Sequence, residues 1–502
     1  MYNFPSDLYA DIRIEHNKTA MYNVQNGEVK QNSETAVSGA IVRVYDGKLW
    51  YTSVTNDLDS IQAELDSLAS IAEPNPDIAN DPAVKLYEVH KDKVLLFEGD
   101  KDNRLITREQ REELVQHYIK ECIDGSIPEL KQWNTGCFCT HTVKEFYSSK
   151  GAEIIQDFQQ CGVYLFYDFV VNGITTTGGK SVMGMDFDLL KNREAEFIER
   201  RERYLDYAKN ALDVTPGDYV CVLSPDVTAM FTHESFGHKS EADFMLNDKT
   251  LQDEWVLGKK VGNELVSICD SGDMMHRGYI AYDDEGTAPK ETWLIKNGVL
   301  TGRLHDANSA ATLGEELTGN ARAQNFGFPP MVRMTNTYMA AGETSPEDII
   351  KGVKDGIYVF AVNYGTGQST FTMQPNCCYR IKDGKLAEPL RVNVVTGSVF
   401  QTLFDIDAVG SDNICAVGYL KTACGNACII VVTVGIIRNC ICFRIVKYGR
   451  TVDEFSCRCR RCIATENEGT GICITVVESN KMPVIRLYEL VEGMAHIACS
   501  QP

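Results

Sequence analysis

Asn-Gly and Asp-Gly pairs recur along this chain, and they constrain its fold more than any other feature. Four of them, Asp46-Gly47, Asn172-Gly173, Asn297-Gly298 and Asp383-Gly384, lie between segments with strand-like composition. Such pairs favour tight hairpin turns because Asn, Asp and Gly readily adopt the positive φ angles that these turns require. The pattern predicts antiparallel β-hairpins in both the N-terminal and the central part of the chain.

Helices are expected between the hairpins. Thr107 is followed three residues later by a glutamine, which is the order of a capping box, and predicts a helix through Cys122. Residues 187–212 are charged and amphipathic and predict one long helix with a solvated face. Ser224 and Pro225 mark a further helix start, because Ser is a favoured N-cap and Pro a favoured first helical residue.

The cysteines divide the chain unevenly. Eight of the 18 lie before residue 400 and ten lie after residue 412. With a plausible boundary at Pro216-Gly217, we expect a domain over 1–215, a second over 216–412 and an atypical cysteine-rich segment over 413–502. Two interpretations of that segment stay open. Its clustered thiols form a small zinc site, or it does not encode a selected fold, as an out-of-frame ending would not.

Charge and hydropathy exclude several classes of function. Lys and Arg number 49 against 70 Asp and Glu, so the net charge is -21. So acidic a chain is a poor general binder of nucleic acid or of anionic membranes. The apolar, uncharged run over residues 427–437 is about half of the ~20 residues that a membrane span needs, and predicts a buried strand. No signal peptide is visible, so the cytosol is the expected compartment.

The strongest chemical signal is a histidine at each end of residues 233–238, with Glu234 directly after the first. Imidazoles suit zinc, and a carboxylate beside a ligand suits a general base. In an ideal helix, residues five apart are rotated by about 140°. His233 and His238 can therefore meet one metal only if the helix ends or bulges between them, and Gly237 offers such a break. The alternative is a helix end with two unrelated surface histidines.

A catalytic zinc site needs a third protein ligand and an open position for water. Spacing alone does not choose among His276, His305, several carboxylates and the thiols after residue 412. Glu241 and Asp243, close behind the motif, either orient the histidines through hydrogen bonds or cap the helix end.

The motif and its continuation resemble the TldD/PmbA family of metalloproteases, on its TldD side. The resemblance runs in order from about residue 5 to residue 412. It comprises ADIR over 10–13, GAIVRV over 39–44, HESFGHKSEADF over 233–244, DDEGT over 283–287, WLIKNGVL over 293–300, TGNAR over 318–322 and RMTNTYM over 333–339.

This resemblance implies an α+β fold, with an N-terminal α/β domain followed by a largely antiparallel β domain that holds the metal. It implies a zinc-dependent peptidase that cuts unfolded proteins or peptides. His233 and His238 would be zinc ligands and Glu234 the general base. The family's TldD-like subunit pairs with a PmbA-like subunit that lacks the motif, so a heterodimer, or else a homodimer, is expected. No nucleic-acid or membrane partner is expected.

The chain departs from the family pattern near the expected third ligand, a cysteine in a Cys-Gly-Lys-x-Gly-Gln stretch. Here Cys424 and Gly425 are followed by Asn-Ala-Cys instead. We predict Cys424 as the third ligand, with Cys428 and Cys415 as alternatives. Two functions therefore stay open: a zinc peptidase, or a non-catalytic peptide-binding subunit of the same fold with an incomplete metal site.

Overall fold

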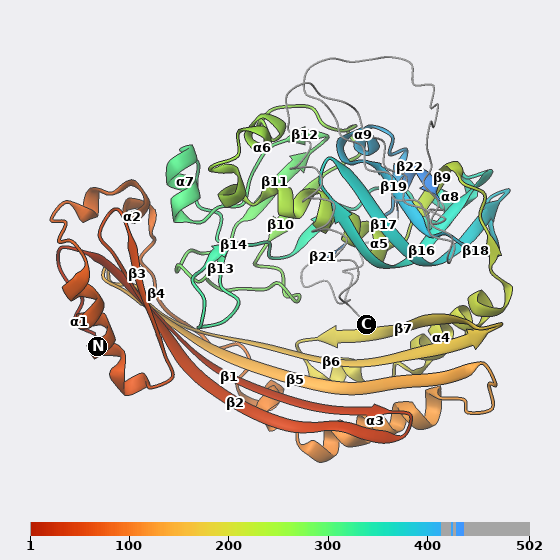
Figure 1. Ribbon diagram of the computed structural model, residues 1–502, viewed down its shortest axis with the longest axis horizontal. Helices are drawn as coiled ribbons and strands as arrows, with labels where there is room; N and C mark the ends of the chain where they lie inside the picture. The colour runs from red at the N-terminus through yellow and green to blue at the C-terminus, as the bar shows by residue number, and fades with distance from the viewer. Residues whose placement is uncertain (1, 413–422, 425–427, 436–502) are drawn as a thin grey trace, which may run out of the picture. The chain divides into compact units, whose positions relative to one another are not determined.

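The N-terminal part of the chain folds into a mostly antiparallel sheet of long strands (Figure 1). The structure is a computed structural model and describes residues 2–412, 423–424 and 428–435. The strand order is β3-β2-β1-β5-β6, and both β4 and β7 pair with β6, β4 in parallel. The strands are β1 (Tyr9–Gln25), β2 (Glu28–Tyr45), β3 (Trp50–Thr55), β4 (Lys91–Val94), β5 (Leu130–Ser148), β6 (Glu153–Val171) and β7 (Ile174–Gly184).

Three of the predicted two-residue turns are present, and each connects neighbouring antiparallel strands. In the turn between β6 and β7, Asn172 and Gly173 have φ angles of 51° and 78°. Both residues of the turns at 297–298 and 383–384 have similar positive φ angles. The connection at Asp46 is longer than predicted, because β3 begins only at Trp50. There Asp46 Oδ1 accepts the backbone N–H groups of Lys48 and Leu49 at 2.8 Å each.

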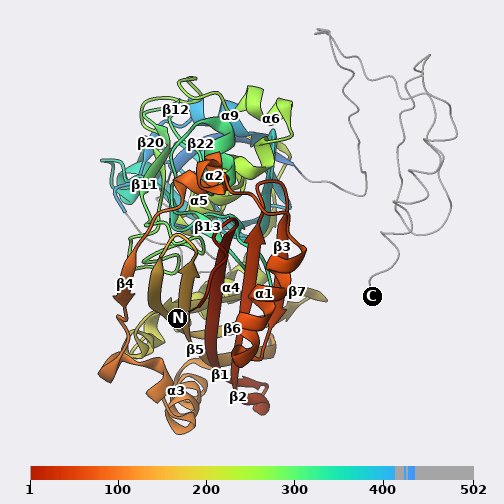
Figure 2. The ribbon, with the colours of Figure 1, turned by 90° about the vertical axis from the view of Figure 1, so that its left-hand side faces the viewer.

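Helices α1 (Ile61–Ile71), α3 (Arg108–Cys122) and α4 (Glu194–Asn210) pack on this sheet. Figure 2 shows α1 alongside β2 and β3. The capping box that Thr107 predicted is present. The prediction of a single helix over 187–212 is wrong. Residues 187–190 form a short 3-10 turn, and Asn192 then takes a φ of 57°, which interrupts the helix before α4 begins.

The second part of the chain contains a sheet that closes on itself. The order is β16-β9-β22-β19-β17-β18-β8, and β16 also pairs with β17, while β20 pairs with β22. The strands are β8 (Leu212–Asp213), β9 (Gly217–Leu223), β16 (Asp355–Gly367), β17 (Thr370–Lys382), β18 (Lys385–Arg391), β19 (Val394–Ser398), β20 (Ala408–Val409) and β22 (Cys428–Gly435). The predicted strand over 427–437 corresponds to β22, which inserts between β9 and β19.

Two smaller sheets complete this part, in the orders β12-β11-β10-β15-β21 and β13-β14. Their strands are β10 (Ile268–Ser271), β11 (Glu291–Lys296), β12 (Val299–Leu300), β13 (Ala321–Arg322), β14 (Met331–Val332), β15 (Thr337–Met339) and β21 (Ala423–Cys424). The remaining helices are α2 (Pro82–Leu86), α5 (Pro225–Thr232), α6 (Lys249–Glu254), α7 (Ala307–Leu313), α8 (Pro346–Lys351) and α9 (Val399–Phe404). A large apolar core, including Phe231, Phe236 and Met334, fills the space between the sheets.

The predicted α+β class with a largely antiparallel second part is confirmed. The division into domains over 1–215 and 216–412 stays a prediction. Most of the cysteine-rich segment over 413–502 lies outside the described residues, apart from the backbone of β21 and β22. Among the described residues, no helix has the length and apolar character that crossing a membrane requires.

A buried acidic loop of the second part is held by the N-terminal sheet. The Lys144 ammonium on β5 donates to Asp284 Oδ1 at 2.7 Å, and Arg13 Nε on β1 lies 3.7 Å from the same oxygen. The other carboxylate oxygen accepts the Ala323 N–H at 2.8 Å. Asp284 therefore connects the N-terminal sheet to the residue that follows β13.

The three acids of this loop have very different proton affinities. Burial raises the pKa of Asp283 to about 7. Burial, together with the charge of Asp306, raises the pKa of Glu285 to about 8. Burial acts in the same direction on Asp284, but the charges of Lys144 and Arg13 outweigh it and hold its pKa at about 2. Asp284 is thus the most acidic of the three and is ionised at neutral pH.

Candidate metal centre

The helix that carries the 233–238 motif changes its winding at the motif. Helix α5 begins at Pro225, and Ser224 Oγ accepts the Val227 N–H, as the sequence predicts. The helix does not end at Thr232. It continues as a π-helical turn over residues 233–237 and then as a 3-10 turn over residues 238–240. In the π turn, the His238 N–H donates to the carbonyl oxygen of His233.

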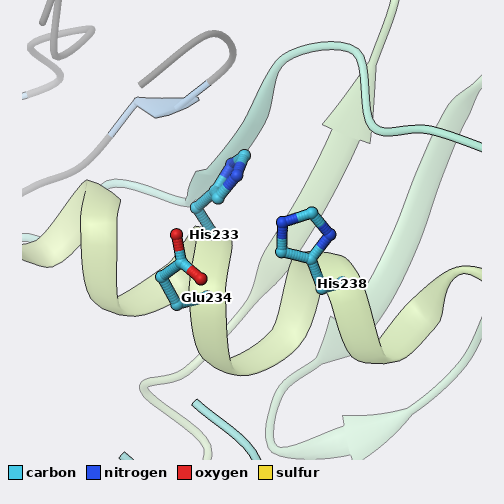
Figure 3. A group of neighbouring side chains, drawn as sticks. All are labelled: His233, Glu234 and His238. Atoms are coloured by element: carbon cyan, nitrogen blue, oxygen red, sulfur yellow. The ribbon is translucent and has the colours of Figure 1, made fainter. Parts of the chain in front are cut away.

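The wide turn brings the two histidines together. A π turn holds more residues than an α turn, so side chains five apart come close to the same face. The ring centroids of His233 and His238 are 4.8 Å apart with planes at 80°. One ligand atom each from His233, Glu234 and His238 all lie within 4.8 Å of one another, and Figure 3 shows the three side chains on one helical segment. The helix thus bulges between the histidines, as their spacing requires.

Gly237 has a different role from the predicted one. Its φ of -57° and ψ of -59° are ordinary helical values, so the backbone here does not need a glycine's freedom. It needs space, because a Cβ on Gly237 would lie 1.9 Å from Met334 Sδ. On another side of the turn, a Cβ on Gly367 of β16 would lie 2.8 Å from the carbonyl oxygen of Glu234. Two glycines therefore let neighbouring segments pack closely around the π turn.

His233 is suited to bind a metal as a neutral imidazole. Its exposed fraction is 8%. Burial, then the nearby charges of His238 and Arg322, lower its pKa to about 4. Within the described part of the chain, His233 Nδ1 has no hydrogen-bond partner. An unpartnered buried nitrogen is costly, so Nδ1 of His233 fits a role as metal ligand.

Glu234 and His238 lie on the more open side of the site. Burial raises the pKa of Glu234, against the opposing effect of His238. The side chain of His238 is 44% exposed, and its Nδ1 lies 3.2 Å from Glu241 Oε2. That hydrogen bond raises the pKa of His238. Of the two acids that follow the motif, Glu241 reaches a histidine, whereas Asp243 accepts the Val332 N–H at 3.3 Å instead.

The two other candidate histidines do not join the cluster. Among the described residues, the group of possible metal ligands at this site consists of His233, Glu234 and His238. His305 Nε2 lies 3.0 Å from Glu315 Oε2, and its Nδ1 lies 3.1 Å from Ser309 Oγ, so both ring nitrogens are occupied. His276 also lies outside the cluster.

The backbone of Cys424 lies in β21, which pairs in parallel with β15 and packs against α5. The Cα partner of Cys424 is Tyr338. Cys428 begins β22, and Cys415 lies outside the described residues. The structure thus brings the strand of Cys424 to the helix of the motif, and the assignment of Cys424 as third ligand stays a prediction.

Two arginines near the site were missed by the sequence reasoning. Arg322 donates to the Met334 carbonyl oxygen at 3.0 Å, and its charge contributes to the low pKa of His233. Arg333 donates to Glu241 Oε2 at 3.3 Å. Both lie in stretches that carry the family resemblance, but nothing in their spacing links them to the motif, because the contacts are long-range.

The site is a helix that bears two imidazoles and a carboxylate, an arrangement typical of metallopeptidases. Comparison with protein families agrees. The PmbA/TldA metallopeptidase C-terminal domain matches residues 216–435, and metallopeptidase domain 1 matches residues 10–73. The chain belongs to the PmbA/TldD metallopeptidase family. The match continues past Asp412, where the resemblance in the sequence fades, and it includes Cys424.

Individual relatives are named as metalloproteases. A metalloprotease of Synechocystis is 30% identical over 420 residues, which is 80% of this chain and 87% of the relative. The zinc metalloprotease TldD homolog of Saccharolobus solfataricus is 30% identical over 305 residues, 59% of this chain and 67% of the relative. Among solved structures, TldE of Thermococcus kodakarensis has a similar fold, with a TM-score of 0.67 at 14% identity over 85% of this chain and 96% of that chain.

Proposed function

We propose that this protein is a zinc-dependent peptidase that hydrolyses peptide bonds in unfolded proteins or peptides. The observation that carries the proposal is that a π turn over residues 233–237 brings His233, Glu234 and His238 together. The name of the Saccharolobus relative supports zinc as the metal. The eight cysteines before residue 400 are free and buried, which supports the cytosol as the compartment, because thiols stay reduced there.

His233 and His238 would hold the ion, with Cys424 as the third ligand. The residues fit zinc, since His233 is neutral at pH 7 and its buried Nδ1 has no partner among the described residues. When bound, zinc would supply Lewis acidity, polarising a peptide carbonyl and making a water molecule more acidic.

Glu234 would move the proton. Its pKa is raised by burial, which brings its proton affinity closer to neutral pH, where a general base works best. The carboxylate takes a proton from the attacking water and then donates it to the nitrogen of the departing amine. His233, with its low pKa, stays uncharged throughout this cycle.

For partners, we propose a peptide or unfolded protein as substrate and a PmbA-like subunit in a heterodimer, with a homodimer as the alternative. The support for a PmbA-like partner is the resemblance to the family, whose TldD-like subunit pairs with such a subunit. The acidity of the chain, with a net charge of -21, argues against nucleic acid as a partner.

A second candidate function is a non-catalytic, peptide-binding subunit. One observation favours it: the residues after Cys424 and Gly425 depart from the family's Gly-Gln pattern. Two imidazoles without a third ligand would hold zinc weakly.

Zinc content and peptidase activity together test both candidates. The full-length protein is purified, its zinc per chain is measured by elemental analysis, and cleavage of casein is followed with and without a PmbA-like subunit. The variant is His233→Ala, and the matched control is His276→Ala, a histidine outside the cluster. About one zinc per chain, lost only in His233→Ala, with casein cleavage, supports the peptidase. Zinc near zero in all three supports the binding subunit, and zinc that survives His233→Ala places the metal elsewhere.

A further inference from the structure

Glu241 is a fully buried carboxylate with a specific set of partners. Its side chain has an exposed fraction of 0%. Oε2 lies 3.2 Å from His238 Nδ1 and 3.3 Å from Arg333 Nη1, so one oxygen serves both groups. Within the described part of the chain, Oε1 has no hydrogen-bond partner. The buried carboxylate is thus directed entirely at one histidine and one arginine.

The backbone fixes Glu241 in this position. The residue forms a parallel bridge with Leu304, and the next N–H, of Ala242, donates to the Leu304 carbonyl at 3.0 Å. Arg333 is held independently, because its N–H donates to the Asn320 carbonyl at 2.8 Å and its Nη1 to the Val332 carbonyl at 2.6 Å. Protein contacts alone therefore hold both Glu241 and Arg333 in position, without a metal.

These contacts determine which nitrogen of His238 carries the proton. Arginine is always a donor, so the Glu241 oxygen that it reaches is an acceptor. His238 Nδ1 must then donate to the same oxygen, which leaves the lone pair of the neutral ring on Nε2. In metal sites, such a carboxylate partner fixes the orientation of the imidazole and raises its basicity.

We propose that Glu241 is the positioning residue of the metal centre: it holds His238 as the Nδ1–H tautomer, so that Nε2 is the ligand atom, and Arg333 keeps the carboxylate in place. This inference rests on the proposed zinc site and assigns a residue and a ligand atom that the motif does not define. Asp243, two residues further on, has no such role, since it faces Val332.

The test uses full-length protein with three substitutions. Glu241→Ala removes the acceptor. Glu241→Gln keeps it, since the amide oxygen can occupy the Oε2 position and the NH2 group the unpartnered Oε1 position. Asp243→Asn is the matched control, a half-buried acid on the same segment without a histidine contact. Zinc affinity is measured by competition with a chromophoric chelator. The tautomer of His238 is read in metal-free protein from the ring 15N shifts, assigned with a His238→Asn variant.

We expect the Nδ1–H tautomer in the metal-free wild type, in Glu241→Gln and in Asp243→Asn. Loss of an outer carboxylate partner typically lowers metal affinity by about 10- to 100-fold. We expect a loss of zinc affinity of this size for Glu241→Ala and a smaller loss for Glu241→Gln. We expect no loss of zinc affinity for Asp243→Asn. If Glu241→Ala does not fold, the zinc affinity of Glu241→Gln and the tautomer of His238 in the wild type still test the inference.

Two results would overturn the inference: a wild-type His238 protonated on Nε2, or a Glu241→Ala protein with wild-type zinc affinity. A wild type that binds no zinc at all would instead refute the proposed function, and with it the role of Glu241 toward a metal. The two failures are therefore distinguishable, because the first is seen in the ring of metal-free protein or in the zinc affinity of a variant, and the second in the zinc content of the wild type.

Discussion

Gly237 packs closely on Met334. We therefore predict that the effect of Gly237→Ala on the free energy of unfolding changes sign when Met334 is replaced by alanine. In Gly237→Ala, the new Cβ would lie 1.9 Å from Met334 Sδ, whereas non-bonded heavy atoms prefer about 3.5–4 Å. One group must retreat by about 2 Å, and Met334, which is 2% exposed, has no solvent to move into. Overpacking of this kind costs about 1–3 kcal/mol, and the overlap here argues for the upper end.

The helical backbone angles of Gly237 act in the opposite direction. Alanine is favoured over glycine in a helix by about 1 kcal/mol. We therefore expect Gly237→Ala to lower the free energy of unfolding by about 2 kcal/mol in the wild type. In a Met334→Ala background the clash is gone, so the same substitution should raise it by up to about 1 kcal/mol. Urea unfolding of the four metal-free proteins, followed by fluorescence, measures this cycle.

The zinc affinity of the same proteins reports on the π turn itself. Gly237→Ala should weaken zinc binding in the wild type, because His238 follows directly on the displaced residue, and Met334→Ala should restore it. Equal destabilisation by Gly237→Ala in both backgrounds would refute the reasoning. It would mean that the turn needs the backbone freedom of glycine rather than the space beside the thioether.

Three further predictions concern the site and the buried loop. Glu234→Gln should keep its zinc but lose at least about 100-fold in casein cleavage, because the proton acceptor is gone; wild-type activity with normal zinc content would contradict this. The pKa of Glu285 is about 8, above its ordinary value of 4.5, so the folded state binds its proton more tightly and stability falls as pH rises between these values. Unfolding midpoints of Glu285→Gln from pH 5 to pH 8 should decline less steeply than those of the wild type, and parallel curves would contradict the assignment. Lys144→Met should cost about 3 kcal/mol at pH 7, since it leaves the ionised Asp284 poorly paired; in Asp284→Asn background that cost should largely disappear.

Local chemistry determined the parts of the fold that the sequence could predict. The turns at Asn172 and Asn297 and the capping box at Thr107 depend on residues within a few positions of one another. The helix over 187–212 was predicted wrongly because amphipathic spacing continues through Asn192, whose positive φ ends the first turn. A single residue such as Asn192 hardly changes the composition of the segment, so the pattern of charges does not reveal that the helix is interrupted there.

For the site, the sequence supplied the residues but not the geometry around them. The spacing of His233 and His238 required a bulge, and the structure has one. The contacts that stabilise it join distant segments: Met334 packs on Gly237, and Arg333 reaches Glu241. No single sequence encodes such pairs in its spacing. The third ligand stayed open for the same reason, since several thiols follow residue 412 and only the fold can choose one.

The π turn can also be understood as one residue too many in an ordinary helix. An extra residue in an α-helix rotates everything after it by about 100°. Here the insertion is absorbed within residues 233–237, so His238 occupies the place that the fourth residue after His233 has in a regular helix. A one-residue deletion at Ser235 would then convert the segment to an α turn with the histidines four apart. The five-residue spacing and the common His-Glu-two-His spacing are, on this view, two lengths of chain that present the same pair of rings.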